Sequence, residues 1–375
     1  MPVELDFTEE QEMLRQMVRG VCATASDLDA VRAMEDDPTG YDPELWNQLA
    51  ELDLLGLLLP EEYGGSGMTM MEGVIVHEEL GRSLAPTPLF VSSVLGAGAI
   101  LRAGSDAQKS EWLPRVCDGS TLLSVAWLEA TGGYRPAGIK TVAEAAGDVF
   151  TVTGTKRHVF FAAAADRLVV LANSGDEIDL FLVDPKGPGV EMTQKHSIAS
   201  DTQYDVTFDG APAERLGDAG SGWVNWHHVM LEGAVLAAAQ ANGGADYAQE
   251  ITVQYTKDRE QFDKPLGAFQ ALQHNMADSQ TAIEGAKLLT YEAAWSHATG
   301  RPIRSLAPMV KMFATQTYRD TTAMAQQIWG GVGFTNEYDI QLFFRRAKSL
   351  QINWWDTQKC EELIATAVLD EEPAA

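Results

Sequence analysis

The sequence has 375 residues, which is enough for two or three domains with a buried core. Hydrophobic residues make up 45% of the chain and charged residues 22%, so the composition excludes an intrinsically disordered or fibrous protein. The net charge of −27 excludes nucleic-acid binding, because a duplex needs many cations to neutralise its phosphates, and it disfavours an anionic membrane surface.

The charge is unevenly distributed along the chain. Residues 1–62 contain sixteen acidic and three basic side chains, whereas residues 255–348 carry eleven of the 27 basic residues. This asymmetry predicts that an anionic ligand, if there is one, binds toward the C-terminal half.

The cysteine content and the apolar segments indicate in which cellular compartment the protein works. Cys22, Cys117 and Cys360 have no CxxC spacing, so we expect neither a disulfide framework nor a four-ligand zinc site, and a reducing cytoplasm fits. The N-terminus is acidic and lacks the apolar stretch of a signal peptide. The densest apolar run, residues 52–60, is far shorter than a membrane span, so we expect none.

The first third of the chain has a helical pattern. Thr8 and Gln11 predict a capping box, and the apolar residues after them recur at helical spacing. Proline and glycine then separate four further expected helices. These cover residues 43–54, 68–84, 88–103 and 108–118.

The middle of the chain changes to short runs rich in β-branched and aromatic residues, with turn signals between them. The runs are residues 149–152, 168–172, 180–183 and 206–208. Because no helical pattern lies between them, they predict an antiparallel sheet rather than βαβ units.

From residue 222 onward the pattern is helical again, and the segments are long. One covers residues 235–258, a second carries an apolar stripe over 269–286, and the rest predict a bundle of four or five helices. The fold class is therefore α+β. We expect an N-terminal helical domain at 1–120, a middle antiparallel β domain of sandwich or barrel type at 121–217, and a C-terminal helical bundle at 218–375.

Five motifs occur in order along the chain, although it has no Walker A sequence and no GxGxxG after a strand. They are LPEEYGGSG at 59–67, EELG at 78–81, the stretch from GTK at 154–156 to residue 166, the segment 255–278 around Arg259, and QIWGGVGF at 327–334 followed by RRAK at 345–348. Together they resemble the acyl-CoA dehydrogenase family over nearly the full length.

The resemblance implies an FAD flavoprotein that oxidises an acyl-CoA thioester to the 2-enoyl form and passes electrons to an electron-transferring flavoprotein or a similar acceptor. It also implies a homo-oligomer or a heterotetramer with a paralogous subunit, in which a neighbouring subunit helps to hold FAD. A carboxylate must remove the α-proton while the β-hydride goes to the flavin, and the thioester oxygen needs hydrogen bonds.

The resemblance also assigns residues to the cofactor. They are Trp127, Leu128, Glu129, His158, Val159, Arg259, Gln261, Phe262, Gln270, Gln327, Gly330 and Gly331.

Several of these residues have simpler interpretations. Arg259 follows a long helix, where the helix dipole favours a cation, and Gly330 with Gly331 could serve as a helix C-cap. His158 stands where the family commonly has tryptophan and could be a half-exposed strand histidine. Leu128 replaces a threonine of the family, so its side chain cannot donate a hydrogen bond.

The catalytic base is the unresolved part of the resemblance. Many family members place a glutamate after the segment equivalent to RRAK, but tryptophan occupies that slot here. Another subset places it on the first C-terminal helix, at a position that falls on Gly233. Glu232 is one residue away, a rotation of about 100° on a helix, and Asp356 is the other nearby carboxylate.

Three hypotheses follow from this pattern. The first is an acyl-CoA dehydrogenase that uses Glu232 or Asp356 as its base. The second is an FAD-supporting subunit without a base in a heteromeric dehydrogenase, and the third is a flavin oxidase or monooxygenase on the same fold. His228 and Glu232 share a helix face, but two ligands without a third predict no metal site.

Overall fold

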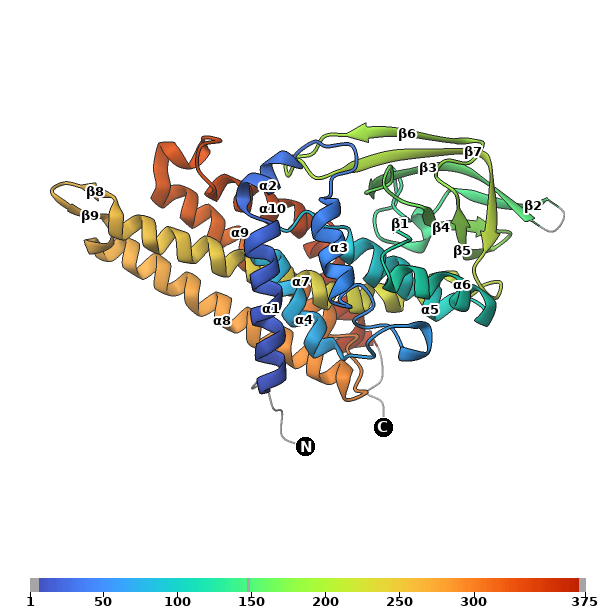
Figure 1. The fold of residues 1–375 in the computed structure, drawn as a ribbon, viewed down its shortest axis with the longest axis horizontal. Coiled ribbons are helices and arrows are strands. Elements are labelled where there is room, and N and C mark those ends of the chain that lie inside the picture. Colours follow the sequence, from blue (N-terminus) through green and yellow to red (C-terminus); the bar gives the residue numbers. More distant parts are fainter. Residues whose placement is uncertain (1–6, 147–148, 371–375) are drawn as a thin grey trace. The chain divides into compact units, whose positions relative to one another are not determined.

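The computed structural model describes residues 7–146 and 149–370, and the chain divides into two compact units (Figure 1). The helical unit comprises Met1–Asp29, Thr69–Ala85 and Ala234–Ala375. The mixed unit comprises Ala30–Met68 and Pro86–Gly233. Helix α7 (Gly222–Asp258) begins in the mixed unit and continues into the helical unit.

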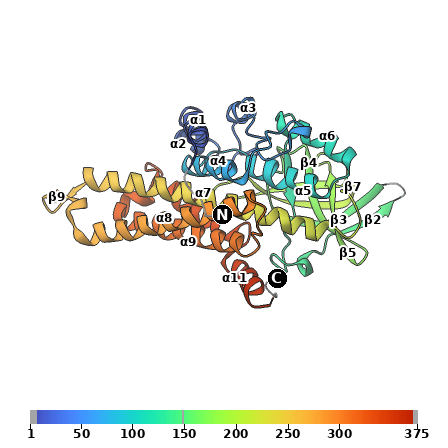
Figure 2. The same cartoon turned by 90° about the horizontal axis from the view of Figure 1, so that it is seen from below.

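The helical unit is dominated by long helices. Helices α7 and α8 run side by side and are joined at one end by a short hairpin, as Figures 1 and 2 both show. The described elements are α1 (Glu9–Ala25), α4 (Met70–Arg82), the second part of α7, β8 (Glu260–Gln261), β9 (Lys264–Pro265), α8 (Gln270–Ala298), α9 (Leu306–Trp329), α10 (Ile340–Ile352) and α11 (Thr357–Ala365).

Charged pairs and glycines set the packing of α4 within the helical unit. Arg19 Nη2 of α1 lies 2.7 Å from Glu79 Oε1 of α4, which ties these two helices together. On another side, α4 meets α7 backbone to backbone. A Cβ at Gly81 would overlap the backbone of Gln240, and one at Gly243 would overlap the carbonyl of Glu78. Only glycine permits so close an approach.

The mixed unit packs short helices around a β-sheet. Its helices are α2 (Leu28–Ala33), which crosses the boundary between the units, α3 (Pro43–Glu51), a π-helix at Phe90–Gly96, α5 (Ala97–Ala103) and α6 (Asp106–Cys117). Its strands are β1 (Leu123–Ala126), β2 (Val142–Ala146), β3 (Val149–Phe160), β4 (Arg167–Ser174), β5 (Glu177–Val183), β6 (Val190–Lys195) and β7 (Gln203–Arg215).

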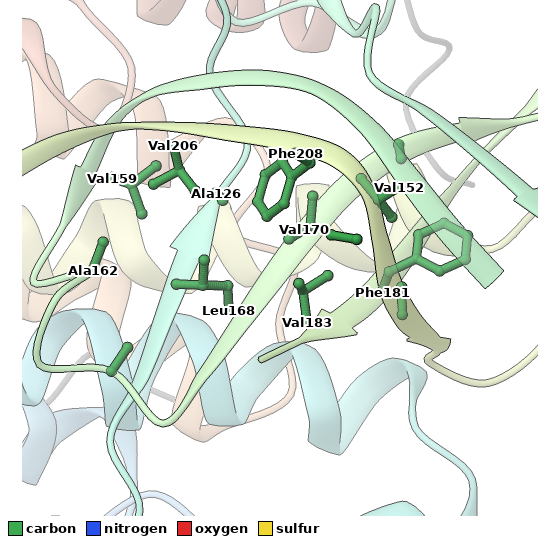
Figure 3. Close-up of a cluster of buried hydrophobic side chains, with 14 of the residues drawn as sticks. Ala126, Val152, Val159, Ala162, Leu168, Val170, Phe181, Val183, Val206 and Phe208 are labelled. Carbon is green, nitrogen blue, oxygen red and sulfur yellow. The ribbon is translucent and has the colours of Figure 1, made fainter. Parts of the chain in front are cut away.

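The sheet of the mixed unit closes on itself. Strands β4, β2, β3, β7 and β5 pair in a circuit, because β5 also pairs with β4. Strand β6 lies beside β7, and β1 lies beside β4. Apolar side chains from these strands point toward one another inside the curved sheet, including Val152, Val159, Phe181 and Phe208 (Figure 3). This core fixes the strand ends that carry several candidate site residues.

The order of helical, β and helical segments confirms the predicted α+β class. The antiparallel prediction holds for most strand pairs, but β1 and the start of β2 both pair with β4 in parallel. Strands β1, β2 and β6 were not among the predicted runs. Strand β1 has only four residues. Three of the five β2 residues are alanine, and β6 is largely polar, so neither has the run of β-branched residues that indicates a strand.

In the described residues, no helix is both long enough and apolar enough to cross a membrane. The three cysteines are buried free thiols.

Candidate functional site

Three aromatic rings gather at the end of strand β1. Trp127 follows the strand and is 4% exposed. Its ring centroid lies 5.2 Å from that of Trp226, in the first turns of α7, and 5.4 Å from that of Tyr134, in the loop after β1. The indole of Trp127 is therefore in contact with both other rings.

Glu129 has its carboxylate engaged inside the mixed unit. Oε1 accepts from Lys156 Nζ at 2.7 Å and from the backbone N–H of Thr141 at 3.1 Å, and both oxygens lie 3.0 Å from the N–H of Lys140. Burial lowers the pKa of Lys156 to about 8, against the opposing effect of Glu129. Burial also acts to raise the pKa of Glu129, but Lys156 and these backbone N–H groups outweigh it and lower the pKa.

His158 lies on an irregularity of β3, where the pairing with β7 shifts register between Lys156 and Val159. Its backbone is left-handed, with φ of 55°, and its side chain is exposed. Gln203 donates through Nε2 to Asp201, so its Oε1 accepts from His158 Nδ1 at 2.9 Å, and Nε2 of the imidazole is on the opposite edge of the ring. Val159 is fully buried in the β core.

In the helical unit, an aromatic stack brings the ends of α7 and α9 together. The rings of Tyr255 and Trp329 stack at 4.0 Å, and Trp329 Nε1 donates to Thr252 Oγ1 at 3.2 Å. Arg259 comes one turn after Tyr255 and is exposed. Gly330 directly follows Trp329. This stack therefore places the arginine and the glycines at the same end of the helical unit.

The hairpin after α7 is exposed and strained at its tip. Phe262 is 85% exposed, and both Phe262 and Asp263 have left-handed backbones, with φ of 56° and 61°. The Phe269 ring lies 6.1 Å from the Phe262 ring and 4.1 Å from Lys264 Nζ. Gln261 and Gln270 are also exposed. A two-residue hairpin turn of this kind requires a positive φ at both central residues, which phenylalanine adopts at a steric cost.

The end of α9 offers open backbone. Gly330 has φ of 65° and ψ of −140°, a conformation that only glycine adopts readily. A Cβ at Gly331 would meet no heavy atom within 4 Å, and Gln327 is exposed. Gly330 does cap α9, because its N–H donates to Gln326 O, so the C-cap interpretation holds as well.

Both candidate bases have structural partners. Glu232 forms an ion pair with Arg102 of α5. Asp356 is the N-cap of α11, and its side chain accepts from the N–H of Lys359 at 2.8 Å.

The turn before α11 holds two buried tryptophans. Trp354 and Trp355 have left-handed backbones, with φ of 55° and 73°, and are 7% and 2% exposed. Lys311 of α9 donates to the carbonyls of Leu350 and Trp355 at 2.9 and 3.1 Å and is fully buried.

Sequence reasoning gave no role to Lys156, Arg102 or Lys311, although Lys156 belongs to the GTK motif at 154–156. A signal existed for Lys156, which falls on the inward-facing side of the alternation in β3 together with Val152. No residue pattern marked the other two. Among residues 7–146 and 149–370, no three histidine, cysteine or acidic side chains are grouped to hold a metal.

Three family models match the chain: the acyl-CoA dehydrogenase N-terminal domain at 8–120, the middle domain at 124–211 and the C-terminal domain at 220–354. The cyclohex-1-ene-1-carbonyl-CoA dehydrogenase of Geobacter metallireducens is 34% identical over 92% of this chain and 94% of its own. This chain belongs to the acyl-CoA dehydrogenase family.

Solved structures of the family match it over nearly their whole length. The butyryl-CoA dehydrogenase of Megasphaera elsdenii matches with a TM-score of 0.91 and 27% identity, over 98% of this chain and 100% of that chain. The ChsE4-ChsE5 complex from Mycobacterium tuberculosis matches with a TM-score of 0.90 and 26% identity, over 99% and 100%. Acyl-CoA dehydrogenases are FAD-dependent oxidoreductases, and tetramers are typical of them.

The residues of the helical unit fit a dinucleotide. Exposed Arg259 and Gln327 are a cation and an amide suited to phosphate and adenine, and the open backbone at Gly331 leaves room for a close approach. In the mixed unit, fewer of the assigned side chains are available to a cofactor. Of the five residues assigned there, His158 presents an exposed side chain, whereas Val159 is fully buried and the Glu129 carboxylate is engaged with Lys156.

Proposed function

We propose that this chain takes part in the FAD-dependent α,β-dehydrogenation of an acyl-CoA thioester to the 2-enoyl-CoA. Bound FAD supplies the hydride acceptor for this reaction. The candidate FAD contacts in the helical unit are Arg259, Gln261, Phe262, Gln270, Gln327, Gly330 and Gly331. Those in the mixed unit are Trp127, Leu128 and His158.

We further propose that the proton-abstracting carboxylate comes from a paralogous chain in a heteromeric assembly. The observation that carries this proposal is that both candidate bases have structural partners. Glu232 is paired with Arg102, and Asp356 caps α11. A carboxylate held by such a partner must give up that bond before it can approach a substrate proton. Trp354 and Trp355 fill the turn before Asp356.

Arg259 extends the proposal to the assembly. It lies at the base of the hairpin formed by β8 and β9, in which residues 260–264 are exposed. An exposed arginine and an exposed phenylalanine on one hairpin are suited to a nucleotide held by a neighbouring subunit. The structural relative ChsE4-ChsE5 is a complex of two chains, which supports a heteromer as a reasonable form for this chain.

The experiment compares the chain purified alone with the chain co-expressed with a paralogous acyl-CoA dehydrogenase from the same genome. We expect little or no anaerobic bleaching of flavin by acyl-CoA with the chain alone, and bleaching with the pair. Glu232→Gln and Asp356→Asn in the pair should leave bleaching intact. Bleaching by the chain alone that either substitution abolishes would instead support a self-sufficient enzyme. Absence of flavin from every combination would contradict the FAD assignment.

The remaining assignments stay predictions. They are an electron-transferring flavoprotein as the acceptor, a cytoplasmic location, and domain boundaries near residues 120 and 217. Reduced chain that passes electrons to such a flavoprotein faster than to oxygen would support the first of them and would exclude an oxidase.

A further inference from the structure

The loop between β1 and β2 is closed at its neck by a single carboxylate. Glu129 stands where the loop leaves β1, and Lys140 and Thr141 stand where it returns to β2. Both backbone N–H groups of the returning segment donate to the Glu129 carboxylate, at 3.0 and 3.1 Å. The resemblance assigned this side chain to the cofactor, but its oxygens are directed to the chain's own backbone.

Lys156 joins the same cluster to the end of β1. Its Nζ lies 2.7 Å from Glu129 Oε1 and 3.5 Å from the carbonyl of Trp127, and the side chain is fully buried. Next to it, Arg157 N–H donates to the carbonyl of Leu128 at 2.9 Å. The strand end, the loop neck and β3 therefore share one buried ion pair.

The loop above this neck folds back on itself. Gly132 and Gly138 lie so close that a Cβ on Gly132 would overlap the Gly138 backbone. Asn173 Nδ2 of β4 donates to the carbonyl of Ile139 at 2.8 Å, which ties the returning limb to the sheet. Within the loop, Tyr134 places its ring 5.4 Å from that of Trp127.

We propose that Glu129 is a positioning residue that, with Lys156, closes the loop 130–139 and holds Tyr134 over Trp127 at the end of β1. The carboxylate acts through the loop and does not itself contact the cofactor. The effect on FAD rests on the proposed function, because Trp127 and Leu128 are proposed FAD contacts. The closure of the loop rests on the geometry alone.

The test uses the full chain without added FAD and three variants. Glu129→Gln removes the charge that pairs with Lys156 and replaces one of the two acceptor oxygens near the Lys140 N–H by an NH2 group, which cannot accept. Tyr134→Ala removes the Tyr134 ring. It shows how the near-ultraviolet circular dichroism changes when Trp127 loses this ring contact. Glu144→Gln, an exposed carboxylate on β2, is the matched control. Hydrogen exchange of residues 131–138, the dichroism and the thermal midpoint are measured for each, and FAD binding is titrated in a separate experiment.

For Glu129→Gln we expect exchange of residues 131–138 to be at least tenfold faster and the aromatic dichroism to change as in Tyr134→Ala. Glu144→Gln should match the wild type in all three readouts. A folded Glu129→Gln chain whose loop exchanges within twofold of the wild-type rate would overturn the proposal. So would weaker FAD binding with unchanged loop exchange, because it would indicate a direct cofactor contact.

The unmodified chain gives a second measurement if Glu129→Gln does not fold. The amides of Lys140 and Thr141 should exchange at least tenfold more slowly than those of residues 131–138, since they donate to the buried carboxylate. Equal rates would refute the closure. A wild-type chain that shows the slow amides but never binds FAD would leave the closure standing and remove the proposed function.

Discussion

Buried charges are the residues of this chain that its local sequence explains least. Lys156 is paired with Glu129, while Lys311 donates to two backbone carbonyls. Glu78 of α4 accepts from Tyr291 Oη at 3.0 Å and from Arg15 Nη2 at 3.3 Å. Burial dominates each environment, lowering the pKa of both lysines to about 8 and raising that of Glu78 to about 7.

Glu78 should make the stability of the chain depend on pH. Its native pKa of about 7 lies above the ordinary value of 4.5, so between these pH values the native state binds more protons than the unfolded state. The free energy of unfolding should therefore fall as pH rises through this window. We expect the fall attributable to Glu78 to approach about 3 kcal/mol, and Glu78→Gln to remove it. Urea unfolding at pH 5 and pH 7.5 measures the difference.

Glu284→Gln is the control for this experiment, because Glu284 is an exposed carboxylate on α8. It should leave the pH dependence as it is in the wild type. An identical pH dependence in wild type and Glu78→Gln would show that Arg15 and Tyr291 keep the Glu78 carboxylate ionised in the native state throughout the window.

The cysteines should differ in reactivity with a thiol reagent at pH 8. Burial raises the pKa of Cys22, Cys117 and Cys360 to about 11, two units above the ordinary 9.0, which cuts the thiolate fraction about a hundredfold. Cys117 also lines an open hollow of roughly 510 Å³ and is 8% exposed. We expect it to be labelled first, as mass spectrometry of partly modified chain would show. Equal labelling of all three thiols before unfolding would contradict this order.

At the level of elements, the sequence predicted the helices and strands that have a clear local pattern of residues. The capping box at Thr8 and the long apolar stripe of α8 indicated helices that the structure contains. Helix α2 has six residues, which are too few to show a helical period. Strand β6 consists mostly of polar residues and has no run of β-branched ones. The predicted class therefore depended on the elements with strong periodicity, and the missed elements are the short or polar ones.

The candidate site was less predictable because it depends on non-local register. The position of His158 is set by a shift in the pairing of β3 with β7, which the sequence of β3 alone does not contain. The partner of Glu232 is Arg102, 130 residues earlier in the chain. Motif comparison proposed the segments of the candidate site, whereas the direction of each side chain required the structure.

The contact between α4 and α7 should be intolerant of any side chain. Gly81→Ala and Gly243→Ala would each force a Cβ into the backbone of the other helix, so overpacking should cost about 3 kcal/mol. Gly20→Ala in α1 is the control, because its Cβ would meet nothing within 4 Å, and it should stabilise the chain by about 0.5–1 kcal/mol. Thermal midpoints report the ranking, and a normal midpoint for Gly243→Ala would refute the close approach.

For the whole molecule, the most acidic segment and the residues proposed to bind the nucleotide lie far apart in the sequence. The net charge is −27, and residues 1–62 carry sixteen acidic side chains. Arg259 and Lys264 lie instead on the exposed hairpin after α7. A strongly acidic chain can therefore bind an anionic cofactor if cations are concentrated where the phosphates lie.

A shared cofactor site should show complementation between variants. We expect Arg259→Ala to lose a phosphate partner and His158→Asp to place a negative charge near the flavin, so each variant alone should bind FAD at least tenfold more weakly. If Arg259 serves the FAD of a neighbouring subunit, dissociating and reassociating a mixture of the two creates sites with both residues intact. Fluorescence titration with FAD should then show a fraction of sites that bind tightly, because random pairing of the two variants forms some intact sites. No recovery, with mixed assembly verified by native mass spectrometry, would contradict a cofactor site shared between two copies of this chain.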